Sequence, residues 1–135
     1  MKNLRYLSKN GFKDLVTGLI KSYQVFGTVK KDGFPSFGRI LNFNDLVLNQ
    51  TPTHLSAKEF LFPQREVLLR FNIEAGAHDA TVESYEQVLI GLHACDIHGV
   101  RLMDRVFSSG VPDANYLARR SKAIIIGVDC MPDEH

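Results

Sequence analysis

The sequence predicts an α/β domain, with α+β as the alternative, in which helices pack on a mixed sheet. Three observations predict this class: an amphipathic helical pattern near the start, an Asp-Gly turn between two β-like segments, and two apolar runs in the C-terminal half separated by helical patterns. The last of these predicts a parallel βαβ unit. Because 135 residues suit one hydrophobic core, we expect residues 1–135 to form a single domain.

The N-terminal region predicts one helix followed by a β-hairpin. Between residues 10 and 23, apolar residues recur at three- and four-residue spacing, which indicates an amphipathic helix. Residues 24–30 and 37–41 then have the composition of strands. Asp32 and Gly33 lie between them and readily take the positive φ angles of a tight turn.

The middle of the chain fits neither period well. Ser56 is expected to cap a short helix with Glu59 in a capping box, and residues 65–72 are expected to form a strand that ends in a polar turn at residues 75–79. The aromatic residues of this region are interpreted as core, with a pocket for a planar cofactor as the alternative reading; they are Phe60, Phe62 and Phe71, next to Pro63.

The C-terminal half carries the clearest signals. Residues 88–91 predict a short buried strand, helical spacing follows from Cys95, and Asp113 is expected to cap a second helix. Residues 122–128 form an unbroken apolar run, which is typical of a strand covered on both faces. Two strands joined by such a crossover should lie parallel. The arginines of these helices are interpreted as exposed to solvent. The alternative is that they pair with ligand phosphates or with carboxylates of a partner. They are Arg101, Arg105, Arg119 and Arg120.

Composition excludes several classes of function. The 16 Lys and Arg residues nearly balance the 15 Asp and Glu residues, so no basic field favours nucleic acid. The apolar runs are too short for a membrane-spanning helix, and no direct membrane insertion is expected. Two cysteines are too few for a disulfide framework, and the N-terminus lacks a signal-peptide pattern, which favours the cytoplasm.

The candidate functional loop runs from Gly91 to Asp96. It should lie at the carboxyl end of a parallel strand and lead into a helix N-terminus, where ligands bind in open α/β sheets. The candidate binding residues in it are Gly91, His93, Cys95 and Asp96. Gln64 and Arg65, which follow Pro63, are the polar residues expected to face a ligand if one binds.

Cys95 admits several interpretations. The helix dipole favours its thiolate, so it is a candidate nucleophile, and with His93, His98 and Cys130 it could supply zinc ligands. The spacing matches no known zinc motif, however, and no metal ligand is assigned. The alternative is a small buried residue at a tight strand–helix junction, beside Asp96 as a helix cap. Neither the dinucleotide nor the P-loop glycine pattern is present, and no hydrolytic triad or His-Glu-x-x-His motif appears.

Several blocks of the sequence resemble the beta subunits of cytoplasmic nickel–iron hydrogenases and sulfhydrogenases, and the A-type subunits of anaerobic sulfite reductases are similar too. The blocks occur in the same order, cover most of residues 53–130, and comprise residues 56–66, 90–98, 102–107, 116–120 and 127–130. The resemblance puts weight on Gly91, Cys95 and Asp96. Where many relatives are expected to have a proline before the Cys-Asp pair, this chain has Ala94.

The resemblance implies an electron-transfer subunit of an anaerobic oxidoreductase complex, with two [4Fe–4S] clusters in a ferredoxin-like C-terminal region. Residues 1–135 lack that region, because Cys95 and Cys130 cannot supply the eight thiolates that two clusters need. We therefore expect the N-terminal portion of a larger iron–sulfur subunit. It would bind no cofactor of its own and have no catalytic residues, and its partners would be the other subunits of a hydrogenase or sulfite reductase complex.

This expectation makes the chain a structural and docking domain that positions clusters held elsewhere, without catalysis of its own. A domain similar to the A-type subunits of anaerobic sulfite reductases is one alternative. Two further alternatives remain open. One is a flavin- or nucleotide-binding domain that uses the candidate loop with Gln64 and Arg65. The other is a stand-alone thiol enzyme with Cys95 as nucleophile.

Overall fold

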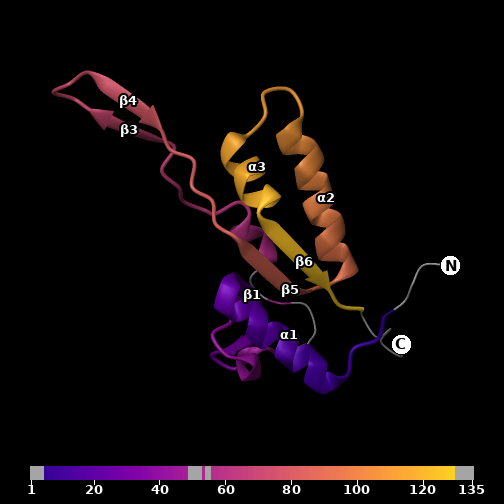
Figure 1. Cartoon of the computed structure of the whole chain (residues 1–135). Coiled ribbons are helices and arrows are strands. Elements are labelled where there is room, and N and C mark those ends of the chain that lie inside the picture. The colour runs from indigo at the N-terminus through magenta and orange to yellow at the C-terminus, as the bar shows by residue number, and fades with distance from the viewer. Residues whose placement is uncertain (1–4, 49–52, 54–55, 130–135) are drawn as a thin grey trace.

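The computed structural model describes residues 5–48, 53 and 56–129, and its centre is a four-stranded mixed sheet with helices on both faces (Figure 1). The predicted α/β class is confirmed. The strand order is β2-β1-β5-β6, where the strands are β1 (Gln24–Lys31), β2 (Phe34–Arg39), β5 (Gln87–Leu92) and β6 (Ala123–Gly127). The described helices are α1 (Lys9–Ser22), α2 (Ala94–Ser108) and α3 (Ala114–Ser121).

The predicted N-terminal helix and hairpin are both present. Helix α1 begins after Ser8, whose hydroxyl accepts a hydrogen bond from the Gly11 N–H at 3.1 Å. Strands β1 and β2 pair antiparallel up to Lys31 and Phe34. The turn between them has φ values of 51° at Asp32 and 87° at Gly33, which is the conformation expected of an Asp-Gly hairpin turn.

The C-terminal half forms the predicted parallel unit. Strands β5 and β6 pair in parallel, and β1 pairs in parallel with the other side of β5, a contact that the sequence did not indicate. Asp113 caps α3 as expected, because its carboxylate accepts a 2.8 Å hydrogen bond from the Tyr116 N–H. The expectation that residues 122–128 are covered on both faces is wrong. β6 is the edge strand, and Ile124 stays 45% exposed because it lies beyond the cover of α1.

Two apolar clusters hold the helices to opposite faces of the sheet. On one face Val16 of α1 packs with alternate residues of the central strands, among them Val88 and Ile90. On the other face Val100 of α2 and Tyr116 of α3 pack with Leu89 and its neighbours. Neighbouring residues of β5 thus belong to different clusters, as the side-chain alternation of a strand requires.

The middle of the chain departs most from the predictions. Ser56 does cap a short helix, but this is a single 3₁₀ turn, η2 (Ala57–Phe60), and its hydroxyl accepts from the Lys58 N–H rather than from Glu59. The strand predicted at residues 65–72 is confined to β3 (Leu69–Asn72). It pairs with β4 (Ala77–Ala80), which begins inside the predicted polar turn, and the two form a separate two-stranded sheet.

The three phenylalanines of this region do not share one environment. Phe60 stacks on Phe26 with ring centroids 4.1 Å apart, and Phe62 stacks on Phe107 at 4.9 Å. The core interpretation therefore holds for Phe60, which packs against the buried cluster, and is wrong for Phe62, which is 43% exposed despite its ring contact. It is wrong for Phe71, which lies on the β3–β4 ribbon with 71% of its surface exposed, because that ribbon leaves the body of the domain.

Helix α3 is attached to the rest of the domain by polar contacts as well as apolar ones. Arg119, expected on a solvated surface, is only 4% exposed; its Nε donates to the Leu61 carbonyl at 2.8 Å and its Nη1 lies 2.7 Å from the Glu66 carboxylate. The Tyr116 hydroxyl donates to Asp104 at 2.7 Å, and Arg120 pairs with the same carboxylate. The helix-surface interpretation of Arg119 is thus wrong, because α3 turns that face towards the 61–66 segment.

The Tyr116–Asp104 hydrogen bond yields a pH-dependent prediction. Burial and the hydrogen bond to Asp104 raise the pKa of Tyr116, so the phenol ionises in the unfolded chain, near pH ~10, before it ionises in the folded one. The stabilisation by Tyr116 is therefore complete below that pH and declines above it. We expect Tyr116→Phe to cost about 1–2 kcal/mol at neutral pH, and this difference to shrink above pH ~10. Urea unfolding of both proteins across that range measures it, and a pH-independent difference would contradict the assignment.

Candidate functional site

The candidate loop lies at the carboxyl edge of the sheet, as predicted. Strands β5 and β6 both end there, and the Val128 N–H donates to the Leu92 carbonyl at 2.9 Å, which holds the two strand ends together. The ladder between these strands is irregular at Gly91, because the pairing passes from Ile90 directly to Leu92. Leu92 thereby joins the same cluster as Leu89, on the α2 side of the sheet.

Gly91 is required at this irregularity by its backbone conformation and by its neighbours. Its φ is +92°, a region that residues with a side chain rarely adopt. A Cβ at this position would lie 3.3 Å from Thr28 Oγ1 and 3.6 Å from Leu48 Cδ2. The glycine thus permits the chain to pass closely over β1 and the segment that ends at Leu48.

His93 and Asp96 interact with each other at the start of α2. The Asp96 carboxylate accepts a 3.4 Å hydrogen bond from the His93 backbone N–H and lies 3.9 Å from the imidazole Nδ1. The His93 side chain is largely buried, and that of Asp96 is partly exposed. The interpretation of Asp96 as a helix-cap acid is confirmed, since it satisfies a backbone donor at the positive end of the helix dipole.

Cys95 lies in the first turn of α2 and is exposed. The interpretation of a small buried residue is therefore wrong, because the first turn of α2 presents Ala94 and Cys95 to solvent and directs Ile97 to the core. Within the described residues, no three His, Cys, Asp or Glu side chains are grouped closely enough to hold a metal ion. Cys130, the other cysteine of the proposed rim, is outside the described residues.

Gln64 and Arg65 lie at the opposite end of the sheet from the loop. The segment that carries them is held at two points. The Phe60 carbonyl accepts a 3.2 Å hydrogen bond from the side chain of Gln87, the first residue of β5, and the Glu66 carboxylate pairs with Arg119. A six-residue strand such as β5 spans roughly 20 Å. Both side chains are exposed. The structure brings Gly91, His93, Cys95 and Asp96 together but does not bring Gln64 and Arg65 to them.

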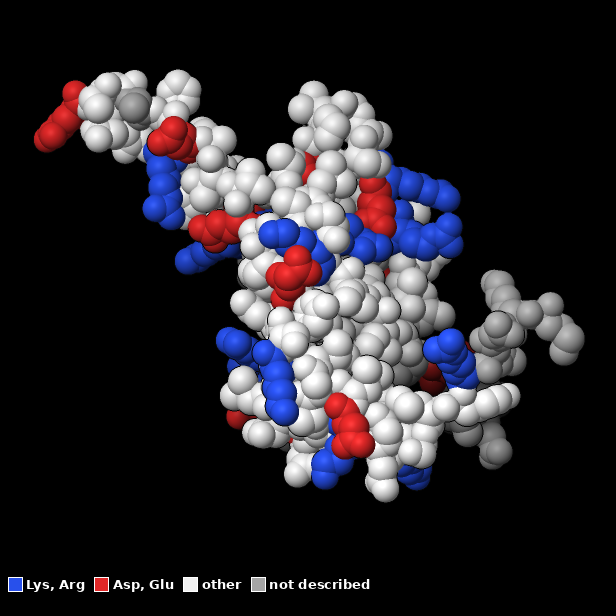
Figure 2. Space-filling view, viewed as in Figure 1, with Lys and Arg blue, Asp and Glu red and all other residues white. Residues whose placement is uncertain are grey.

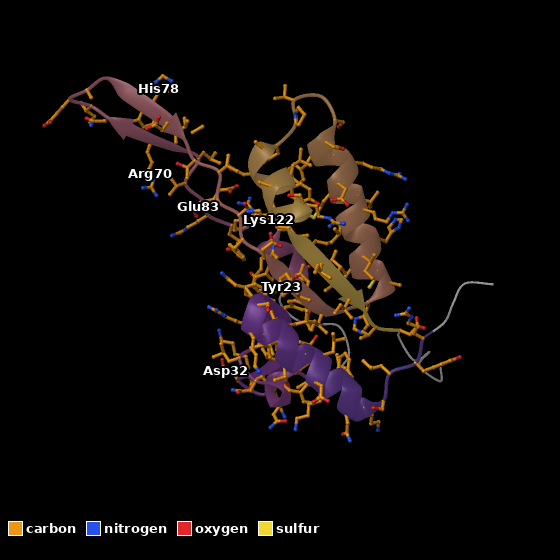
Figure 3. The ribbon with its side chains drawn as sticks, viewed as in Figure 1. Tyr23, Asp32, Arg70, His78, Glu83 and Lys122 are labelled. Atoms are coloured by element: carbon orange, nitrogen blue, oxygen red, sulfur yellow. The ribbon has the colours of Figure 1, made fainter. Side chains whose placement is uncertain are left out.

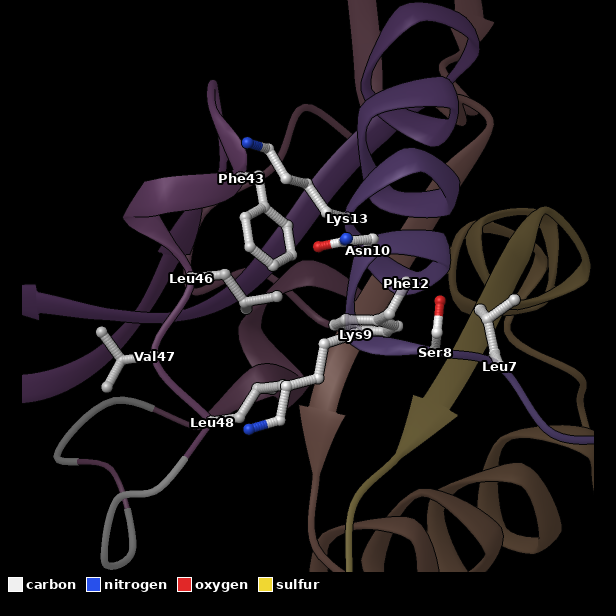
Figure 4. A pocket seen from close by; sticks show the side chains of 10 residues that line it. All are labelled: Leu7, Ser8, Lys9, Asn10, Phe12, Lys13, Phe43, Leu46, Val47 and Leu48. Atoms are coloured by element: carbon white, nitrogen blue, oxygen red, sulfur yellow. The ribbon is translucent and has the colours of Figure 1, made fainter.

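A pocket of about 690 Å³, which the sequence did not indicate, lies between α1 and residues 43–48 (Figure 4). Leu48 lines it and also approaches Gly91, so the pocket is close to the carboxyl edge. Its walls are mainly apolar, with Phe12, Phe43 and Leu46 facing the space and polar groups on the α1 side; the full lining is Leu7, Ser8, Lys9, Asn10, Phe12, Lys13, Phe43, Leu46, Val47 and Leu48. The apolar group Leu46-Val47-Leu48, which lies outside every predicted helix and strand, is a sequence feature that could have pointed to it.

The glycine at the loop generates a stability prediction. We expect Gly91→Ala to destabilise the domain by about 1–3 kcal/mol, because alanine must adopt φ near +92° against Thr28. Gly18→Ala is the matched control: Gly18 is inside α1, nothing lies within 4 Å of an added Cβ, and the change should stabilise the helix by about 0.5–1 kcal/mol. Denaturant unfolding measures both. Equal midpoints for Gly91→Ala and wild type would show that the loop tolerates a side chain.

Comparison with known proteins identifies a relative in Pyrococcus furiosus. Sulfhydrogenase 2 subunit beta of Pyrococcus furiosus is 32% identical to this chain over 134 residues, which is 98% of this chain and 40% of the relative. The chain thus spans about two fifths of the length of the curated relative that it matches. No family model matches the sequence, and no solved structure matches it either. No helix within the described residues is long and apolar enough to cross a membrane.

Proposed function

We propose that this chain is a structural and docking domain of an electron-transfer iron–sulfur subunit in a cytoplasmic, anaerobic hydrogenase-type oxidoreductase complex. The observation that carries the proposal is the match to Sulfhydrogenase 2 subunit beta, which extends over nearly the whole chain. In this proposal residues 1–135 are the N-terminal portion of the subunit. The two [4Fe–4S] clusters belong to a further region, and this domain is not catalytic alone.

The geometry of the loop supports a structural role for the candidate residues. Gly91 allows a close passage over Thr28, and Asp96 and His93 are engaged with each other at the helix start. These contacts fix the junction between β5 and α2. A rigid junction of this kind suits a platform that holds neighbouring electron carriers at a set separation.

The proposal predicts that the 135-residue chain incorporates no iron–sulfur cluster. After anaerobic incubation with ferrous iron and sulfide, followed by desalting, we expect no stoichiometric iron and no sulfur-to-iron charge-transfer absorption, because two cysteines cannot ligate a cluster of this type. A two-cluster ferredoxin treated in parallel is the positive control. Stoichiometric iron that is lost in Cys95→Ser would contradict the proposal and assign cluster binding to the loop.

A flavin- or nucleotide-binding domain is the second candidate, and the pocket beside α1 favours it. Its volume falls in the range of small-molecule sites, and its mainly apolar walls carry Lys9 and Lys13, which could face a phosphate. Under the leading proposal we expect no saturable signal when FMN, FAD or nicotinamide nucleotides are titrated into the chain. Saturable flavin quenching that is abolished by Leu46→Asp in the pocket wall, and retained by Val111→Asp on a distant loop, would favour this candidate instead.

A further inference from the structure

The β3–β4 ribbon is a two-stranded sheet that leaves the body of the domain at the amino edge of β5 (Figure 1). Among the described residues its strands pair with each other and with no further strand, through the register from Leu69 and Ala80 to Asn72 and Ala77. An isolated two-stranded hairpin is at best marginally stable in water. The ribbon therefore gains stability if another surface covers it.

The two faces of the ribbon differ in chemistry. Directly opposed residues of an antiparallel pair share a face, so Leu69 and Phe71 lie on one side with Ala80 and His78. Arg70 and Asp79 lie on the other side, and Arg70 is 4.0 Å from Glu83 (Figure 3). One face is thus mainly apolar, and the other carries the charges.

The apolar face is unusually open to solvent. Phe71 is 71% exposed, and Ile73, in the turn that joins the strands, is 95% exposed. More apolar residues are exposed along the base of the ribbon: Val67, Leu68, Leu69 and Val82. Several large apolar side chains exposed on one ribbon indicate an interaction site.

We infer that this apolar face, with Leu69 and Phe71, and the exposed turn residue Ile73 dock into an apolar groove of another protein subunit in the complex. The inference rests on the proposed function, which supplies the complex. The charges of the turn and of the opposite face favour a protein over an anionic membrane, because Glu74 and Asp79 are acidic and Arg70 lies 4.0 Å from Glu83. Figure 2 shows acidic atoms at the far end of the ribbon, and a groove with a cationic rim would complement them.

The size of the face argues for a different subunit rather than a second copy of this chain. Its exposed apolar surface is on the order of 500 Å², below the ~800 Å² per partner that a specific interface of standard size buries. Two ribbons packed face to face would bury only this area. A groove that surrounds a ribbon can also cover its other face and pair with the outer main-chain edges of β3 and β4.

The base of the ribbon is held so that the apolar face is presented in a defined orientation. On the β3 side, Glu66 pairs with the buried Arg119 at 2.7 Å, which attaches the chain to the body of the domain three residues before β3 begins. The Thr81 N–H donates to the Leu68 carbonyl at 2.9 Å, which extends the pairing between the two arms of the ribbon by one residue towards its base. Such anchoring lowers the ordering cost of association. The ribbon thus resembles a preorganised arm more than a loose loop.

The inference is tested with the full chain, tagged and expressed in the organism that encodes it. The ribbon variant Phe71→Asp/Ile73→Asp should lower the yield of co-purified hydrogenase-type subunits by about tenfold or more, because it places charges at the centre of the apolar contact. The matched control is Val106→Asp/Val111→Asp, at exposed apolar positions of α2 and the following loop, which should leave the yield unchanged. Denaturant unfolding should show that the bodies of both variants are folded.

Site-specific cross-linking identifies what touches the ribbon. For this experiment p-benzoylphenylalanine replaces Phe71 in an otherwise unchanged chain. Illumination of the isolated complex should then yield a cross-linked peptide from another subunit. A wild-type chain that co-purifies with no other subunit contradicts the proposed function and the inference with it. If subunits do co-purify, the inference alone is overturned by a cross-link to a second copy of this chain, by no cross-link at all, by full yield with the ribbon variant, or by ribbon-dependent sedimentation with phosphatidylglycerol vesicles.

Discussion

Strand β5 must bury all six of its residues, and the rest of the fold follows from that requirement. A strand that is apolar on both faces needs neighbours at both edges and helices on both sides. β1 pairs with one edge of β5 and β6 pairs with the other, both in parallel. α1 covers one face and α2 with α3 the other, and alternate side chains of β5 belong to the two separate apolar clusters.

The two ends of β5 differ in character. At the carboxyl end, the positive φ of Gly91 lets the chain leave the sheet over Thr28, and α2 begins at once with Asp96 bonded back to His93. At the amino end, polar groups are buried: Gln87 bonds to the Phe60 carbonyl, and Arg119 bonds to Leu61 and Glu66. Buried donors of this kind are costly unless paired, so these contacts fix where the ribbon leaves the domain.

The division between these ends changes the interpretation of the candidate site. A ligand that touches Gly91, His93, Cys95 and Asp96 together with Gln64 and Arg65 would have to extend along the whole of β5. The loop is better explained as a shaped junction with one exposed thiol at its surface. Two open apolar surfaces lie elsewhere, in the pocket beside α1 and on the ribbon, and the ribbon is the one on which the docking inference rests.

Features that depend on residues close together in the chain could be predicted from the amino-acid sequence. The α1 pattern, the positive φ angles at Asp32 and Gly33, and the Asp113 cap each involve a few consecutive residues, and all are present as predicted. Burial, in contrast, depended on tertiary contacts. Arg119 is buried because α3 directs it towards Leu61 and Glu66, which are more than fifty residues away in the sequence. Phe71 is exposed because its strand, β3, belongs to the separate two-stranded sheet and not to the four-stranded one. Residue type determines the free energy that burying a side chain costs or gains. Which distant segments come into contact is determined only by the order in which the strands pair in the tertiary structure.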